Sequence, residues 1–560
     1  MRRVPGLSHM LELLVELDRL RAERDRTLAE RAELHRVLAE RDASLTERDT
    51  NLAELKTTLA NINLDRASDF PSRTEDQQPW RHPFLTSVNV ARFREYSEQV
   101  WQVAAEHAVR RPELPRMAFN VNLAQSMYNW ARLARNAGAD VELFPSPLDT
   151  NAISSPAWED YDGEFGDVHG GAEFLKHVGT VDFAVPVRRL EMADRGLLNA
   201  YRAWLHGDRG RLQRLVAPTP SLRPEPFFAY DGIYPYFDWA RQLAEFDVSV
   251  VASIPIPAYL SGRPYLALTV GGDLIFDCGR GDSYGRIMAT SFNAARFLVL
   301  TNPHVVGQCR RLGFRNALYL PFLMDDERYS PGHGAARERW EAKLGKGVYV
   351  LAAARIDNHV KGNGSQLLEA LAEAAKRRPE LRFVFLGWGH NAAELQAAIQ
   401  ARGLEKQFWI IPPVGKKRLI DYYRSADIVL DQMVWGYYGA TGLEAAAVGK
   451  PIVMMLRTEH YAPLYRGDVA PVVNVTGPAE VTEALEGLAK DASRRAALSA
   501  ETRSWLVRNH GAKVALPRLL ATARLAADQV ALPLDLQSPL ADEVSEEELR
   551  YHQSCLVTNS

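Results

Sequence analysis

The stretch Trp435-Gly-Tyr-Tyr-Gly-Ala-Thr-Gly-Leu-Glu444-Ala-Ala-Ala-Val-Gly-Lys-Pro451 decides how this chain folds. The apolar residues 428–430 before it predict a strand, and its glycines predict a turn that opens a helix of small residues. Such a turn lets a ligand approach the backbone and points the free N–H groups of the helix at an anion. A carboxylate just inside the helix, Glu444, can bind two neighbouring hydroxyl groups, as on a ribose. The stretch therefore predicts a site for a nucleotide-diphosphate sugar.

Strands and helices alternate on both sides of this stretch. In the second half of the chain the pattern predicts strands at 348–354, 382–387, 408–411, 428–431 and 452–456, with helices at 365–377, 391–402 and 416–425. In the first half it predicts a helix at 90–110, a strand–helix–strand unit over 117–144 and further strands at 247–254, 265–269 and 297–300. Two such blocks predict an α/β fold with two Rossmann-like parallel-sheet lobes.

A long N-terminal helix precedes these lobes. Leucine recurs every seven residues at Leu38, Leu45, Leu52 and Leu59, which predicts a coiled coil that joins two copies or recruits a partner. The expected division is a coiled coil at 1–66, a linker and helix at 67–115, an N-terminal lobe at 116–333 with an insert at 145–175, a C-terminal lobe at 334–510, a terminal helix at 511–535 and a disordered acidic tail at 536–560.

Bulk properties exclude several classes of protein. The net charge of −3 argues against binding to nucleic acid through phosphate neutralisation. Three cysteines without paired spacing predict no disulfide framework or zinc cluster, and indicate a reducing cytoplasm. The N-terminus lacks the apolar region and cleavage site typical of a signal peptide, so we expect none. No apolar run reaches the roughly 18 residues that a membrane span needs, so we expect at most peripheral membrane contact.

Two cations lie in the turn after the strand at 348–354. Arg355 follows the strand, and Lys361 and Gly362 precede the helix that begins near Ser365. The carboxyl edge of a parallel sheet is where such folds bind ligands, and two cations there can neutralise the charge of a departing diphosphate. By themselves, Arg355 and Lys361 would be interpreted as two solvated surface residues. Together with the glycine turn and Glu444, it predicts a diphosphate site.

The second block resembles the donor lobe of a GT-B glycosyltransferase, of the retaining type called family 4 or glycosyl transferases group 1. Four features carry the resemblance. They are the turn with Arg355, Lys361 and Gly362, the strand end at Gly387-Trp-Gly389, the entry Tyr423-Arg-Ser-Ala-Asp427, and the helix with Gly439, Glu444, Ala445, Ala447, Gly449 and Pro451. A weaker match in the first lobe lies at Val270-Gly-Gly-Asp273 and at Leu320-Pro-Phe-Leu-Met-Asp325.

The resemblance implies roles for particular residues. Glu444 would hold the ribose hydroxyls, while Arg355 and Lys361 would hold the diphosphate. The donor-binding set would also include Gly362, Gly439, Ala440, Thr441, Gly442 and Leu443. In the first lobe, Asp273, Gly272 and Asn122 would contact the acceptor or the sugar, although capping of a helix is an equally good reading of Asp273. The implied reaction is sugar transfer with retention to a glycan, lipid-linked glycan or protein. It would need no metal and no cofactor beyond the nucleotide sugar.

Two positions depart from the resemblance. The family's helix motif has a first Glu eight residues before the second, and Gly436 stands there, so Asp431 or Gln432 would have to substitute. A His beside the Gly-x-Asp loop is replaced by Val270, and His304 reads as a turn residue. Two alternatives therefore stay open. One is a GT-B nucleotide-sugar epimerase, and the other is a catalytically weak scaffold of the same fold that acts through its coiled coil.

Overall fold

The computed structural model describes residues 89–145, 152–166, 182–188, 208, 210, 213–214, 217, 219–223, 235–278, 283–541, 546, 549–550 and 552. All of these belong to the compact unit His82–Ser560. The predicted coiled coil at 1–66 lies outside the described residues, as do most of the linker that follows it and about half of the insert at 145–175.

The N-terminal lobe is built on a six-stranded parallel sheet with the order β2-β1-β3-β4-β5-β6. Its strands are β1 Met117–Asn120, β2 Val141–Phe144, β3 Val248–Ala252, β4 Tyr265–Leu268, β5 Phe297–Leu300 and β6 Ala317–Tyr319. Its helices are α3 Val90–Arg110, α4 Ser126–Asn136, α5 Ala157–Asp160, α9 Pro235–Leu243, α10 Ile256–Ser261, α11 Ser283–Asn293 and α12 Val306–Arg311. Five of the strands are buried at every position, as expected of a parallel sheet covered on both faces.

The C-terminal lobe contains a second six-stranded parallel sheet, with the order β12-β11-β10-β7-β8-β9. The strands are β7 Val348–Ala352, β8 Leu381–Leu386, β9 Phe408–Ile411, β10 Ile428–Leu430, β11 Ile452–Met454 and β12 Val473–Asn474. Helices α13 Ala336–Leu344, α14 Ser365–Arg377, α15 Ala392–Ala401, α16 Lys416–Ser425, α17 Ala440–Val448, α18 Thr458–Leu464 and α19 Pro478–Lys490 flank it. The strand order reverses between β7 and β10, which is where sheets of this kind bind ligands.

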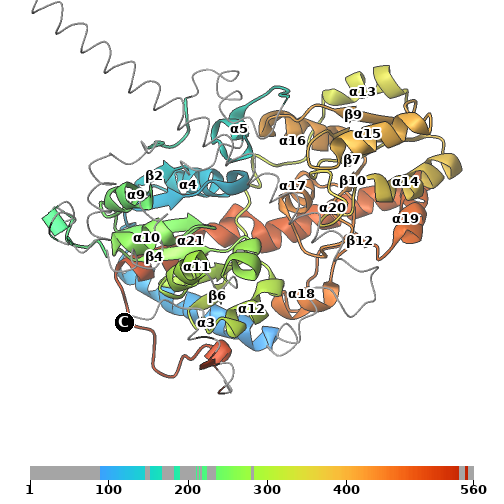
Figure 1. Ribbon diagram of the computed structural model, residues 1–560. Helices are drawn as coiled ribbons and strands as arrows, with labels where there is room; N and C mark the ends of the chain where they lie inside the picture. The colour runs from blue at the N-terminus through green and yellow to red at the C-terminus, as the bar shows by residue number, and fades with distance from the viewer. Residues whose placement is uncertain are drawn as a thin grey trace, which may run out of the picture. The chain divides into compact units, whose positions relative to one another are not determined.

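The two long helices that follow α19 run from the C-terminal lobe back to the N-terminal lobe (Figure 1). Helix α20 Ala492–His510 packs against α17, and α21 Ala512–Ala527 packs against α3, α4 and the central strands of the first sheet. Between them, the carbonyl of His510 accepts a hydrogen bond from the N–H of Met324, at 3.0 Å. The helix at 90–110 is thus part of the N-terminal lobe.

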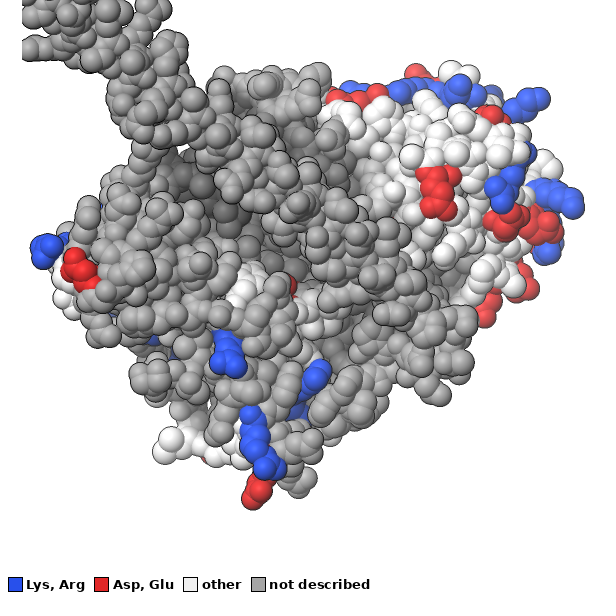
Figure 2. Space-filling model, viewed as in Figure 1, with Lys and Arg blue, Asp and Glu red and all other residues white. Residues whose placement is uncertain are grey.

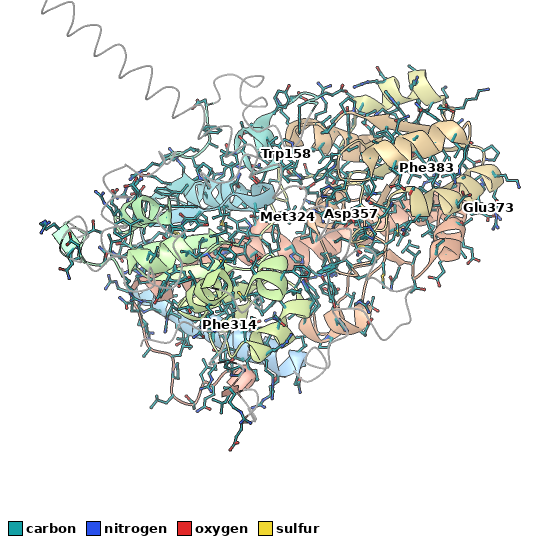
Figure 3. All side chains as sticks on the ribbon, viewed as in Figure 1. Trp158, Phe314, Met324, Asp357, Glu373 and Phe383 are labelled. Carbon is teal, nitrogen blue, oxygen red and sulfur yellow. The ribbon has the colours of Figure 1, made fainter. Side chains whose placement is uncertain are left out.

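The structure corrects one sequence prediction about the tail. Ser538 and Leu540 are buried, and His552 donates to the carbonyl of Arg310 at 3.1 Å, so described parts of the tail pack on the N-terminal lobe. Phe314 and Phe383, labelled in Figure 3, mark the cores of the N-terminal and C-terminal lobes. On the face in Figure 2, basic and acidic side chains of the C-terminal lobe are interleaved. No helix among the described residues is both long and apolar enough to cross a membrane.

Candidate functional site

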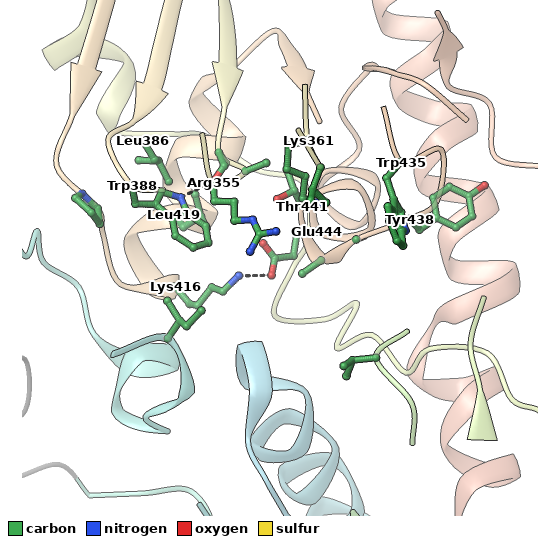
Figure 4. Close-up of a pocket in the computed structure, with 18 of the residues that line it drawn as sticks. Arg355, Lys361, Leu386, Trp388, Lys416, Leu419, Trp435, Tyr438, Thr441 and Glu444 are labelled. Atoms are coloured by element: carbon green, nitrogen blue, oxygen red, sulfur yellow. Dashed lines mark hydrogen bonds and ion pairs between the residues drawn. The ribbon is translucent and has the colours of Figure 1, made fainter. Parts of the chain in front are cut away.

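A pocket of about 440 Å³ lies where the loops after the strands of the two sheets face each other. The C-terminal lobe contributes loops that follow β7, β8, β9 and β10, and the N-terminal lobe contributes loops that follow β4 and β5. The pocket brings together Arg355, Lys361 and Glu444 with the start of α17 (Figure 4). Three side chains chosen on chemical grounds from two separate segments therefore share one cavity, of the size that holds a small ligand.

The turn after β7 is held by its own side chains. The Asp357 carboxylate accepts hydrogen bonds from the N–H groups of His359 and Val360, at 2.9 and 2.7 Å. Asn363 accepts from the N–H of Asp357 and donates to the carbonyl of Arg355, both at 3.0 Å. Burial alone would raise the pKa of Asp357, but the Val360 N–H, the Arg355 guanidinium and the His359 N–H together lower it. An ionised Asp357 thus fixes the turn that carries Arg355.

Lys361 points toward the start of α17. Its ammonium nitrogen lies 3.4 Å from the position that a Cβ on Gly439 would take. Gly362 follows with φ +63°, and a Cβ there would lie 2.3 Å from Val434, so only glycine fits. Gly439 is the N-cap of α17 and offers no side-chain cap. The amide groups of the first turn therefore face the pocket beside a cation, which suits an anion.

Glu444 is buried at 5% exposure and has two partners. The Lys416 ammonium forms an ion pair with one of its carboxylate oxygens, and the Tyr423 hydroxyl donates to the other at 3.1 Å. Lys416 is itself only 4% exposed, and its ammonium lies 4.7 Å from the centre of the Trp158 ring. Glu444 enters the pocket already held by a cation, a neighbour that the sequence analysis did not identify.

The loop before α17 explains the departure at Gly436. This residue has φ +82°, and a Cβ there would lie 2.7 Å from the Arg457 side chain, so no glutamate fits. Gln432 accepts from the N–H groups of Val434 and Gly436 and donates to the carbonyl of Met455, so it holds the loop. Asp431 is fully buried, and neither residue lines the pocket.

The N-terminal lobe places the three predicted contact residues differently. Gly272 lines the pocket, but Asp273 and Asn122 do not. The Asp273 carboxylate accepts from the Thr269 hydroxyl and from three backbone N–H groups of its own loop. Burial raises the pKa of Asp273 to about 6, although these hydrogen bonds oppose the rise. Asn122 is 1% exposed and bonds to Gln125, Tyr128 and Ser154. Asp273 and Asn122 thus support loops and are not pocket residues.

The described part of the insert, 152–166, docks on the loop between β9 and α16. The Trp158 indole donates to the carbonyl of Val414 at 2.8 Å, and the backbone of Phe165 donates to Pro413 at 2.9 Å. Both aromatic residues line the pocket, and α5, which carries Trp158 (Figure 3), packs against α16 of the C-terminal lobe. Asp160 and Asp162 bind Tyr128, Arg328 and Arg418. The segment therefore forms a pocket wall that joins the two lobes.

His304, read from the sequence as a turn residue, also lines the pocket. It lies in the 3-10 turn Pro303–Val305 after β5 and is 5% exposed. Its ring packs on Tyr437 at 4.3 Å and meets Trp435 edge-on at 5.7 Å. A signal was available, because His304 follows an apolar strand, as the ligand-binding residues of such sheets do. No sequence pattern indicated that Lys416 belongs to the site, because its partner Glu444 lies 28 residues further along the chain.

Comparison with known proteins agrees with this geometry. Residues 336–505 match the family described as "Glycosyl transferases group 1". The chain is 30% identical over 313 residues to the D-inositol 3-phosphate glycosyltransferase of Arthrobacter sp. (strain FB24), covering 52% of this chain and 72% of that protein. It is 29% identical over 182 residues to the protein of the same name from Corynebacterium kroppenstedtii, covering 31% of this chain and 40% of that relative.

Solved structures show a looser likeness. A sucrose-phosphate synthase from Thermosynechococcus elongatus aligns with a TM-score of 0.49 and 13% identity, over 74% of this chain and 99% of that protein. The sequence identity to these relatives defines the class of protein. This chain is a two-lobed α/β protein with the donor lobe of a glycosyltransferase. The chain belongs to the glycosyl transferases group 1 family.

Proposed function

We propose that this protein transfers a sugar from a nucleotide-diphosphate sugar to an acceptor, with retention at the anomeric carbon. The observation that supports this most is the shared pocket of Arg355, Lys361, Glu444 and the uncapped start of α17. In this proposal the two cations and the amides of Ala440 and Thr441 bind the diphosphate, and Glu444 binds the ribose. Membership in the family supports the same reaction class.

The chemistry requires no group from the protein that forms a covalent bond. The bond from the anomeric carbon to the leaving phosphate oxygen breaks, and a bond to the acceptor oxygen forms on the same face of the sugar. The acceptor proton goes to the departing phosphate. Arg355 and Lys361 stabilise the charge that develops on the diphosphate, so catalysis consists of positioning and electrostatics. The reaction needs no metal or other cofactor in this proposal.

The base of the nucleotide fits the apolar end of the pocket. Leu386, Trp388, Pro413, Val414 and Leu419 of the C-terminal lobe line that end, together with Trp158 and Phe165 from the docked insert. Two indole rings there offer flat surfaces on which a base can stack. The proposed order along the pocket is thus base, ribose at Glu444, diphosphate at Lys361, and sugar toward the N-terminal lobe.

Product analysis tests the proposal and separates it from its rivals. The purified chain is incubated with UDP- and GDP-sugars, with and without an acceptor panel that begins with D-inositol 3-phosphate, the compound in the relatives' names. A transferase releases nucleoside diphosphate and a retained glycoside in an acceptor-dependent manner. A nucleotide-sugar epimerase inverts a carbon of the sugar in its nucleotide-sugar substrate and needs no acceptor. Binding of a nucleoside diphosphate with no turnover on any acceptor would support the scaffold.

A further inference from the structure

The imidazole of His304 is a buried polar group without a hydrogen bond. Neither of its ring nitrogens has a hydrogen-bond partner among the described residues, although the side chain is 5% exposed and lines the pocket. Buried polar atoms in proteins are almost always bonded, and one left without a partner costs stability. An imidazole kept in this state at the wall of a ligand pocket indicates that a ligand supplies the partner.

Neighbouring groups hold the ring in one orientation. Tyr437 covers one face, with ring centres 4.3 Å apart at 32°, and Trp435 meets the ring edge-on. The Nε2 atom lies against Gly271, which has φ +97°, and a Cβ there would lie 2.8 Å from Nε2. Asn302, two residues earlier, accepts a hydrogen bond from the Tyr461 hydroxyl at 2.6 Å. The turn is thus anchored to the C-terminal lobe, and the orientation of the ring is set before any ligand binds.

The charge state of His304 selects the kind of ligand. Burial, and to a lesser extent His460, lowers the pKa of His304 to about 3. At neutral pH the ring is therefore uncharged, with one nitrogen that donates and one that accepts. A neutral imidazole adds no positive charge toward a diphosphate, whose charge Arg355 and Lys361 neutralise in the proposed function. It suits hydroxyl groups, which both donate and accept.

The position of His304 matches the sugar end of the pocket. Leu386, Trp388 and Leu419 lie on one side of Arg355 and Glu444 in Figure 4, while Trp435 and Tyr438 lie on the other. His304 packs on Trp435 and therefore belongs to that second end. We propose that His304 hydrogen-bonds the hydroxyl groups of the transferred sugar, so that the pocket distinguishes a nucleotide sugar from its nucleoside diphosphate. This inference rests on the proposed function and extends it to a named residue.

The test compares the affinity of one variant for a nucleotide sugar and for its nucleoside diphosphate. His304→Phe keeps a ring against Tyr437 and removes both nitrogens. Calorimetry measures the affinity for two pairs of ligands, UDP with UDP-glucose and GDP with GDP-mannose. We expect the variant to lose about tenfold in affinity for the nucleotide sugar that wild type binds, and to bind the nucleoside diphosphate within about twofold of wild type. His304→Asn, which keeps a donor and an acceptor, should lose less. His333→Phe, at an exposed histidine, is the control and should change neither affinity.

The outcomes separate this inference from the proposed function. If His304→Phe and His304→Asn bind both ligands as wild type does, or lose affinity equally for both, the role assigned to His304 is wrong while the pocket assignment stands. If wild type itself binds neither member of any pair, the proposed function fails and this inference falls with it. Melting temperatures without ligand verify that each variant is folded.

Discussion

The two lobes meet at the pocket with opposite chemistry. The C-terminal lobe contributes charge: Arg355, Lys361, Lys416 and Glu444 all come from its loops or helix starts. The N-terminal lobe contributes neutral surface, namely Val270, Gly272, Phe276, His304 and the aromatic rings of the insert. In the proposed function the first set binds the charged diphosphate and the second set contacts the uncharged sugar, while the base lies between the insert and apolar residues of the C-terminal lobe. The comparison predicts that changes in the C-terminal lobe abolish nucleotide binding, whereas changes in the N-terminal lobe alter which nucleotide derivative is bound.

The buried pair Lys416–Glu444 should give the largest effect. Lys416→Met or Glu444→Gln alone leaves one charge buried without its partner, which costs about 3 kcal/mol of folding free energy. The double variant Lys416→Met/Glu444→Gln should recover most of that stability yet still fail to bind nucleotide. Denaturant unfolding of the three variants measures this coupling, with Lys343→Met as an exposed control. Equal stability of wild type and both single variants would show that the pair is not held as described.

Lys361 should dominate turnover. Lys361→Ala removes the cation beside the start of α17, and we expect kcat/KM for transfer to fall by about 100-fold or more, since charge on the leaving diphosphate is then poorly stabilised. Steady-state kinetics on the acceptor found by product analysis provide the measurement. Lys343→Ala is the matched control, because this lysine is exposed and outside the pocket. Wild-type kinetics in Lys361→Ala would show that Lys361 does not stabilise the leaving diphosphate.

The docked insert should have a smaller effect. A Cβ on Gly415 would lie 2.0 Å from the carbonyl oxygen of Tyr161, so Gly415→Ala pushes the segment 152–166 away from the C-terminal lobe. We expect nucleotide affinity to fall by about tenfold, because the wall that carries Trp158 moves. Titration calorimetry measures the loss. Gly477→Ala, where a Cβ has no neighbour within 4 Å, serves as control. An unchanged affinity would mean that the insert does not shape the base site.

His304 should also produce a small dependence of stability on pH. Its pKa is lowered in the folded protein to about 3, from 6.5 in the unfolded chain, so acid favours the unfolded state. Between pH 7 and pH 6 this histidine should cost about 0.7 kcal/mol of folding free energy. Because His304→Phe lacks the titrating group, its melting temperature should fall less than that of wild type over this interval. An equal fall in both proteins would contradict the buried neutral imidazole.

The sequence predicted most of the C-terminal lobe because its signals are local. Helices α14 and α16 and strand β9 have the expected bounds, since periodicity within a single segment identifies each of them. Strands β6 and β12 were not predicted, because three and two residues are too few to show a period. Arg355, Lys361 and Glu444 were predicted from short motifs, because each motif lies within a single loop or helix.

The unpredicted features arise between distant segments. Lys416 meets Glu444 because α16 and α17 pack together, and Trp158 reaches Val414 across 256 residues. Asp273 was placed in the pocket from its motif, yet its oxygens accept bonds from its own loop. His304 was read as a turn residue, and only the packing of Tyr437 and Trp435 around it reveals its burial. Such contacts depend on tertiary structure, which a single sequence does not specify.

A crystal structure with the bound nucleoside diphosphate would show whether Lys361 and the start of α17 hold the diphosphate. We expect diphosphate oxygens within hydrogen-bond distance of the Lys361 ammonium and of the N–H groups of Ala440 and Thr441, with the ribose hydroxyls on Glu444. A diphosphate bound elsewhere on the protein, or one in this pocket without contact to Lys361 and α17, would contradict it.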